Sequence, residues 1–209
     1  MFMLRLACLI CVVAVSTVVV NSAILLGAPS GEVAALGNRT YGAEFTVGSL
    51  DLSVTDLGAF DLGEDGLNES HQVGLWDSSN TLLGSVTVPA GTGATLIGEY
   101  RYVSLALPVA LSANTTYWIG ALFDNQGTTD DIGIQGSASV DPAIASANLQ
   151  RRSITLNTFE RPTDPSGVNG WAANMQFTAV PEPQSYAALF GIALLAFASY
   201  RKLRSGRTH

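Results

Sequence analysis

The fold class is indicated most clearly by one stretch near the C-terminal end, Trp171-Ala172-Ala173-Asn174-Met175-Gln176-Phe177-Thr178. Large apolar side chains fall on every second residue, as they do in a strand that turns one face to a core. One face would carry Trp171, Ala173, Met175 and Phe177, and the other Ala172, Asn174, Gln176 and Thr178. We therefore predict a strand over this stretch that closes one sheet of a β fold.

Similar segments recur upstream, rich in β-branched and aromatic residues and separated by Gly, Asn, Asp, Ser and Pro. They predict strands at Tyr41–Val47, Ser53–Phe60, His71–Trp76, Leu82–Val88, Tyr100–Leu105, Thr116–Phe123 and Ser153–Asn157. Residues 137–150 are rich in Ala and Ser, and both a loop and a short helix remain open there. Eight strands predict an all-β protein with a single, jelly-roll-like β-sandwich domain over residues 24–179.

The amino-acid composition limits the classes of partner that this domain can bind. The 209 residues include 17 acidic and 10 basic ones, and 47% are hydrophobic. A basic nucleic-acid binder and a mostly disordered chain are both excluded. Residues 24–179 hold every acidic residue except Glu182, five arginines and no lysine. So acidic a domain repels polyanions, and a neutral glycan or a cation is the better partner.

The N-terminal segment has the parts of a secretory signal peptide. Arg5 precedes the apolar run Leu6–Val20, and small residues follow at Ser22 and Ala23. We predict that residues 1–23 form this signal and that cleavage follows Ser22 or Ala23. An uncleaved anchor is the alternative, but it needs about 20 apolar residues. Both cysteines, Cys8 and Cys11, lie in this segment, so the mature chain would have no disulfide, thiolate metal site or cysteine nucleophile.

The C-terminal segment, residues 180–209, has three parts in a fixed order. Pro181-Glu182-Pro183 comes first, and a predicted transmembrane helix at 186–200 follows it. Such a helix reaches roughly 22 Å, less than the roughly 30 Å of a bilayer core. A basic tail that contains Arg201, Lys202, Arg204 and Arg207 comes last and fixes that end on the cytoplasmic side.

This order resembles the PEP-CTERM sorting signal of Gram-negative bacteria, carried here by Pro181, Glu182, Pro183, Arg201, Lys202 and Arg204. The resemblance implies recognition by an exosortase, a membrane-embedded cysteine transpeptidase. It also implies an inner-membrane intermediate that is processed on its way to the cell surface or the exopolysaccharide matrix. An ordinary tail anchor is the alternative.

A second resemblance covers about Thr40 to Phe177. It rests on Leu57-Gly58-Ala59-Phe60-Asp61, Gly74-Leu75-Trp76-Asp77, Arg101-Tyr102-Val103 and Leu111-Ser112-Ala113-Asn114-Thr115-Thr116-Tyr117. These stretches are similar to an uncharacterised bacterial surface β-domain that is found joined to varied anchoring signals. That resemblance implies a fold and residence at the surface, and no activity.

Two groups of residues are candidates for ligand binding. Oxygen-bearing side chains gather in one Gly-containing loop, a setting that suits calcium but also an ordinary solvated turn; they are Asp61, Glu64, Asp65, Asn68 and Glu69. Exposed aromatic rings can stack on sugars, and we expect Trp118 and Tyr100 to face outward. The other aromatic candidates, Trp76, Tyr102, Tyr117 and Trp171, are expected in the core.

The sequence offers little support for catalysis. His71 is the only histidine of residues 24–179 and shares strand parity with Val73 and Leu75, which favours a structural role. No Gly-x-Ser-x-Gly motif is present, and we assign no catalytic residue. The expected function is therefore a non-catalytic structural or adhesive role at the surface or in the matrix, without a cofactor. A carbohydrate-binding module, with or without calcium, is the alternative, and an enzyme comes third.

Overall fold

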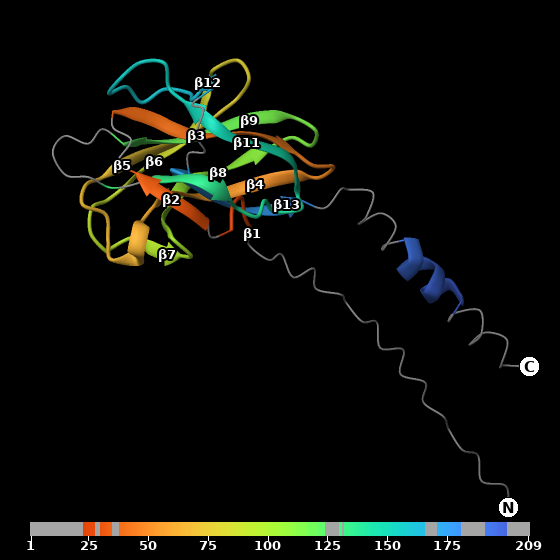
Figure 1. Cartoon of the computed structure of the whole chain (residues 1–209). Coiled ribbons are helices and arrows are strands. Elements are labelled where there is room, and N and C mark those ends of the chain that lie inside the picture. The colour runs from red at the N-terminus through yellow and green to blue at the C-terminus, as the bar shows by residue number, and fades with distance from the viewer. Residues whose placement is uncertain are drawn as a thin grey trace, which may run out of the picture.

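The computed structural model describes residues 23–27, 30–34, 38–123, 130, 132–165, 171–180 and 191–199. The predicted signal peptide up to residue 22, the Pro-Glu-Pro element and the basic tail lie outside these ranges. Of the predicted helix at 186–200, residues 191–199 are described and are helical (Figure 1). Among the helices within the described ranges, none has both the length and the apolar character needed to cross a membrane.

Two antiparallel sheets make up most of the fold (Figure 1). The first sheet has the strand order β1 (Ala23–Ile24), β13 (Ala173–Val180), β4 (Asp51–Phe60), β8 (Tyr100–Leu111) and β7 (Thr95–Ile97). The second has the order β12 (Asp164–Pro165), β11 (Ile144–Arg152), β3 (Arg39–Val47), β9 (Thr116–Phe123), β5 (His71–Trp76) and β6 (Leu82–Val88). A separate pair is formed by β2 (Ser30–Ala34) and β10 (Ile132–Ser137). The predicted β-sandwich is therefore confirmed.

The core lies between the sheets because alternate residues of each strand turn inward. In β9, Tyr117, Ile119, Ala121 and Phe123 are buried in it. From the first sheet, Leu57, Met175 and Phe177 join the same core. This burial supplies most of the driving force for folding.

Most predicted strands are present, and β5, β6 and β9 have the predicted bounds. Two predictions near the end of the second sheet are wrong. Ser153–Asn157 is not a strand, and residues 144–150 belong to β11 instead of to a loop or helix. The Ala, Ser, Asn and Gln side chains of β11 have little intrinsic preference for a strand. Its pairing with β3 decides its conformation, as tertiary context often does in sheets.

The last long strand does not close its sheet, contrary to the prediction. Strand β1 lies beyond β13, with Ala23 opposite Phe177 and Ile24 opposite Gln176. Asn174 is consequently buried, and its side chain accepts a hydrogen bond from the Leu26 N–H at 3.1 Å and donates one to the Leu26 carbonyl at 2.8 Å. The chain just after the predicted cleavage site is thus part of the sandwich.

A row of glycines crosses the outer face of the second sheet. Gly42, Gly120 and Gly74 are paired in register on β3, β9 and β5. The segment that follows β11 packs against this row, with Phe159 near Gly74 and Pro162 near Gly120. Trp76 is therefore buried, as predicted, but on the outer face against the ring of Phe159, whose centroid is 5.1 Å away.

Gly120→Ala should destabilise the protein because a Cβ atom at this position would lie 2.7 Å from the Thr40 methyl group and 3.0 Å from Pro162. We expect a loss of about 1–3 kcal/mol, the usual cost of overpacking. Gly93→Ala is the matched control, since no heavy atom lies within 4 Å of a Cβ there. Urea unfolding of both variants is the measurement. Equal stabilities would mean that the segment does not pack on the glycine row.

Candidate functional site

The predicted calcium loop is organised by a buried ion pair. The Asp61 carboxylate follows β4 and accepts a hydrogen bond from Arg101 Nε at 2.6 Å. The Arg101 side chain is 5% exposed and that of Asp61 is 2% exposed. The backbone N–H of Gly66 also donates to Asp61, at 3.2 Å from either carboxylate oxygen. Asp61 is thus engaged with a cation of the protein itself.

Arg101, on β8, connects two loops through its remaining nitrogens. Nη1 donates to the carbonyls of Thr92 at 3.0 Å and Ala94 at 3.2 Å, and Nη2 donates to the Glu64 carbonyl at 2.9 Å. These bonds hold the loop that contains the 3-10 helix η1 (Leu62–Glu64) against the loop after β6. The hydrogen bonds from Arg101 hold the backbone of both loops in place, so the Asp61–Arg101 pair has a structural role.

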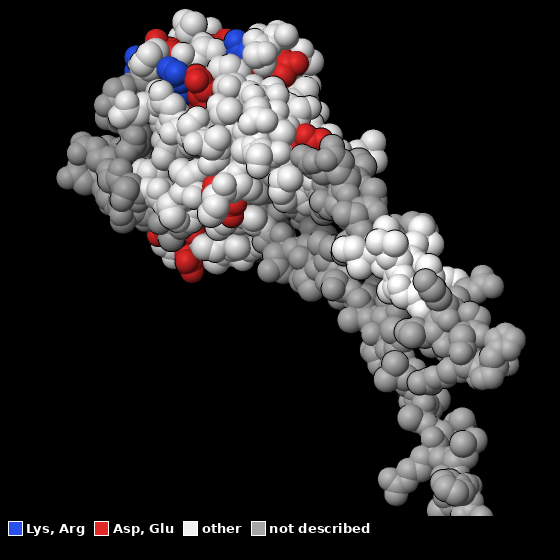
Figure 2. All heavy atoms as spheres, turned by 90° about the vertical axis from the view of Figure 1, so that its right-hand side faces the viewer, with Lys and Arg blue, Asp and Glu red and all other residues white. Residues whose placement is uncertain are grey.

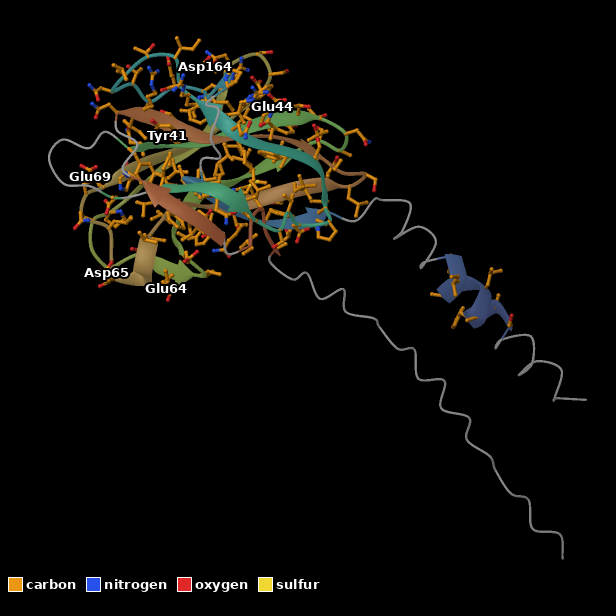
Figure 3. The ribbon with its side chains drawn as sticks, in the orientation of Figure 1. Tyr41, Glu44, Glu64, Asp65, Glu69 and Asp164 are labelled. Atoms are coloured by element: carbon orange, nitrogen blue, oxygen red, sulfur yellow. The ribbon has the colours of Figure 1, made fainter. Side chains whose placement is uncertain are left out.

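The five calcium candidates do not gather at one point. Glu64 and Asp65 are exposed and lie at the η1 end of the loop, whereas Glu69 lies at its other end (Figure 3). Asn68 and Glu69 instead border a second group, around His71. These residues lie within nine positions of the sequence. In the structure, however, Asp61 binds Arg101, whereas Asn68 and Glu69 bind Asp130.

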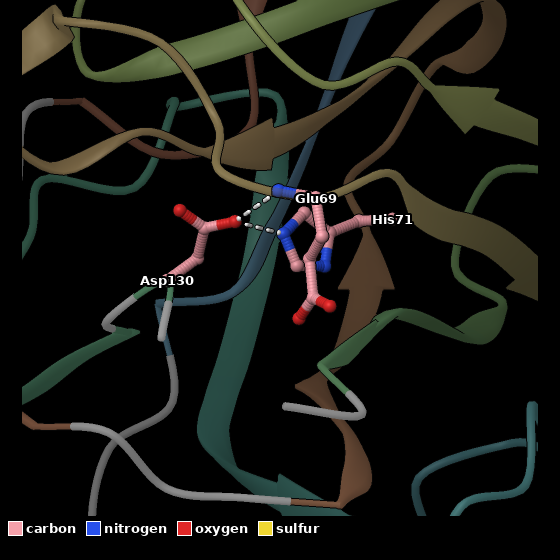
Figure 4. A group of neighbouring side chains, drawn as sticks. All are labelled: Glu69, His71 and Asp130. Carbon is pink, nitrogen blue, oxygen red and sulfur yellow. Dashed lines mark hydrogen bonds and ion pairs between the residues drawn. The ribbon is translucent and has the colours of Figure 1, made fainter. Parts of the chain in front are cut away.

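His71 opens β5 and is completely buried. Its ring stacks on Phe123 with the centroids 4.0 Å apart. Nδ1 lies 2.9 Å from the Leu122 carbonyl oxygen, and Nε2 lies 2.9 Å from Oδ2 of Asp130 (Figure 4). The two ring nitrogens therefore face the Leu122 carbonyl on one side and the Asp130 carboxylate on the other.

Asp130 is held by four donors. Oδ1 accepts from the backbone N–H and the side-chain amide of Asn68, each at 2.9 Å. Oδ2 accepts from the Glu69 N–H at 3.1 Å and from His71. Burial raises the pKa of Asp130, but the bonds from His71, Asn68 and Glu69 outweigh it, and the pKa of this carboxyl is lowered. Asp130 is therefore ionised and secures the start of β5.

The expectation that Tyr100 faces outward is wrong. Tyr100 is 1% exposed and packs on Phe60, with the ring centroids 5.4 Å apart. Burial, with Tyr102 and Glu99 nearby, raises the pKa of Tyr100, so its hydroxyl stays protonated. The first three residues of β8 are all buried, so buried and exposed residues do not alternate there. No sugar can stack on this buried ring.

Trp118 is half-buried on the outer face of the second sheet. The Arg161 guanidinium lies over its ring, 4.5 Å from the centroid, and Arg161 Nη1 donates to the Asp77 carbonyl at 2.7 Å. One face of the indole therefore has a cation on it. Tyr102, Tyr117 and Trp171 are buried as predicted. Glycan binding at Trp118 remains a prediction.

Surface charge gathers in small groups. On the face shown in Figure 2, basic atoms lie near the top, where β11 and β12 run in Figure 1. Here Arg151 donates to Glu44 at 2.7 Å and Arg152 donates to Asp164 at 2.9 Å. These pairs are partly exposed and contribute little stability. Of the other arginines in the described ranges, Arg101 is buried, Arg161 lies over the Trp118 ring and Arg39 donates to the Ser153 carbonyl.

Sequence reasoning identified His71 but missed its partner. Asp130 is 59 residues away and lies in a polar stretch without strand periodicity. No spacing links a histidine on one strand to a carboxylate in a distant loop. The one available signal was the inward parity of His71, since a buried polar side chain requires a partner.

Comparison with known proteins gives a family and no activity. No curated protein matches the sequence. The family model described as a domain of unknown function, DUF4082, matches residues 29–181. This range includes both sheets apart from β1, and it agrees with the resemblance to an uncharacterised β-domain. The chain belongs to this family, DUF4082.

Proposed function

We propose that this protein is an exported component of the cell surface or exopolysaccharide matrix with a non-catalytic, structural or adhesive role. In this proposal a signal peptide directs export, and an exosortase acts on a PEP-CTERM signal at residues 180–209. The β-sandwich is the part that remains outside the cell and has the structural or adhesive role.

The observation that carries the proposal is that described strands lie directly beside both predicted signal segments. Its first described strand starts at Ala23, next to the predicted cleavage site, and its last strand ends at Val180, next to Pro181. The two ends lie together, because Ala23 is opposite Phe177. Cleavage after Ser22 would leave β1 whole, and cleavage after Val180 would leave β13 whole. This supports the interpretation of both segments as sorting signals.

The chemistry of the domain supports a non-catalytic role. His71 is completely buried and stacked on Phe123, and so cannot reach a substrate in this conformation. Asp61 and Arg101 are engaged with each other and with backbone. Residues 24–179 contain no lysine and have a large acidic excess, which favours solubility outside the cell and repels polyanions.

Alanine substitution of Pro181, Glu182 and Pro183 in the native host tests the sorting step. We expect the variant to accumulate in the inner membrane with its basic tail, because the extended Pro-Glu-Pro substrate is lost. Thr208→Ala is the control and should be processed as usual. The measurement is fractionation with antibodies against the sandwich and against a tag after His209. Normal processing of the triple variant would contradict the proposal.

A further inference from the structure

A second site lies at the start of β5, away from the Asp61–Arg101 pair. Within the described ranges, one group of His, Asp and Glu side chains has converging ligand atoms, all within 4.8 Å of one another: Glu69, His71 and Asp130. We propose that these three residues bind a divalent transition-metal ion such as Zn²⁺. This inference goes beyond the proposed surface role and does not depend on it.

The histidine is oriented as a metal ligand requires. Its Nδ1 donates to the Leu122 carbonyl, which leaves Nε2 as the ligand atom. A hydrogen bond from the other ring nitrogen fixes the ring orientation and the tautomer of metal-binding histidines. Stacking on Phe123 and complete burial hold the ring in place. Nε2 therefore points at Asp130 without further rearrangement.

Charge balance favours a dication. The carboxylates of Glu69 and Asp130 bring two negative charges, and histidine binds a metal ion as the neutral imidazole. A dication bound to all three ligands therefore brings the total charge to zero. His71 and Asp130 are buried, where an unbalanced charge is costly. A bound dication thus neutralises the two carboxylates of the site.

The geometry needs only small movements. Nε2 and Oδ2 of Asp130 are 2.9 Å apart, and two ligands on a tetrahedral zinc are about 3.4 Å apart. The gap must open by about half an ångström. Glu69 is only partly buried, and its carboxylate lies beside the His71 ring in Figure 4, so a side-chain rotation can bring it in. Bonds from Asn68 and the Glu69 N–H hold Asp130 beside the site, so its carboxylate must turn within these bonds for the gap to open.

The kinds of ligand atom in the site determine which class of metal ion it can bind. One imidazole nitrogen and two carboxylate oxygens, with water in a fourth position, suit zinc and similar transition metals. Calcium requires six to eight oxygen ligands, and the neighbouring Glu64 and Asp65 are exposed at the far end of the loop. The sequence pattern that suggested calcium thus contributes Glu69 to a site of different chemistry.

Zinc binding is tested on the full chain in detergent, with Cys8→Ser, Cys11→Ser and His209→Ala. In this background His71 is the only histidine and no cysteine remains. After removal of metal with a chelator, Zn²⁺ is titrated by calorimetry and the bound zinc is examined by X-ray absorption. We expect one zinc per chain with one imidazole ligand. Zinc without imidazole, or no saturable binding, would overturn the proposal.

Glu69→Gln separates a metal site from a structural cluster. It removes the carboxylate but keeps the backbone N–H that donates to Asp130, so folding should persist. We expect zinc affinity to fall at least about tenfold and the zinc-dependent rise in Tm to shrink accordingly. Glu64→Gln and Asp65→Asn are matched controls on the same loop and should bind zinc normally. Unchanged affinity in Glu69→Gln, or equal loss in the controls, would contradict the site.

Discussion

Arg101→Met should lower the free energy of unfolding by about 3–5 kcal/mol, the usual loss when one partner of a buried ion pair is removed. Methionine keeps much of the length of the side chain but leaves the Asp61 carboxylate buried and unpaired. The carbonyls of Glu64, Thr92 and Ala94 lose their donor as well. Urea unfolding followed by tryptophan fluorescence measures the change.

Arg152→Met is the control for this prediction. Arg152 also donates to a carboxylate, that of Asp164 at 2.9 Å, but the two side chains are 36% and 38% exposed. Solvent replaces the lost partner there, so the expected loss is below about 1 kcal/mol. Similar losses in the two variants would show that the Arg101 pair is not the buried connection between loops described above.

Leu25→Ala should destabilise the sandwich by about 2–5 kcal/mol, because a large buried aliphatic side chain is replaced by a cavity. Leu25 is 0% exposed although it lies two residues from the predicted end of the signal peptide. Its N–H donates to the Met175 carbonyl at 3.1 Å, and its carbonyl accepts from the Asp141 N–H at 3.2 Å. The residues immediately after cleavage would thus be essential to the fold.

Leu107→Ala provides the comparison, since Leu107 is 79% exposed on β8. The same chemical change there should alter stability by less than about 0.5 kcal/mol. Thermal and urea unfolding of both variants show whether the loss of stability comes from the burial of the leucine or from the change of residue type alone. A negligible effect of Leu25→Ala would mean that the sandwich does not extend to the predicted cleavage site.

Local sequence patterns predicted the strands in which alternation and composition agree. In β9, Tyr117, Ile119 and Ala121 alternate with outward residues, and the strand has the predicted bounds. Alternation of apolar and polar residues failed as a guide where both faces of a strand are covered by other parts of the protein. Tyr100 is buried in a stretch of β8 without alternation, and β11 is a strand only because β3 pairs with it.

The candidate sites were less predictable than the strands because they depend on contacts between distant residues. Asp61 appeared as one oxygen ligand among five, and nothing local indicated that Arg101, 40 residues away, would bind it. Glu69 was identified for calcium, whereas its neighbours in space are His71 and Asp130. Loop composition indicates polar chemistry, but the partner of each side chain is set by the topology of the sheets.

The most direct test of the exported-sandwich account is the intact mass of the protein isolated from its native host. We expect an N-terminus at Ala23 or Ile24 and a C-terminus within residues 180–209, without the arginines of the tail, in material from the cell surface or matrix. A cytosolic protein with the mass of all 209 residues would contradict the account.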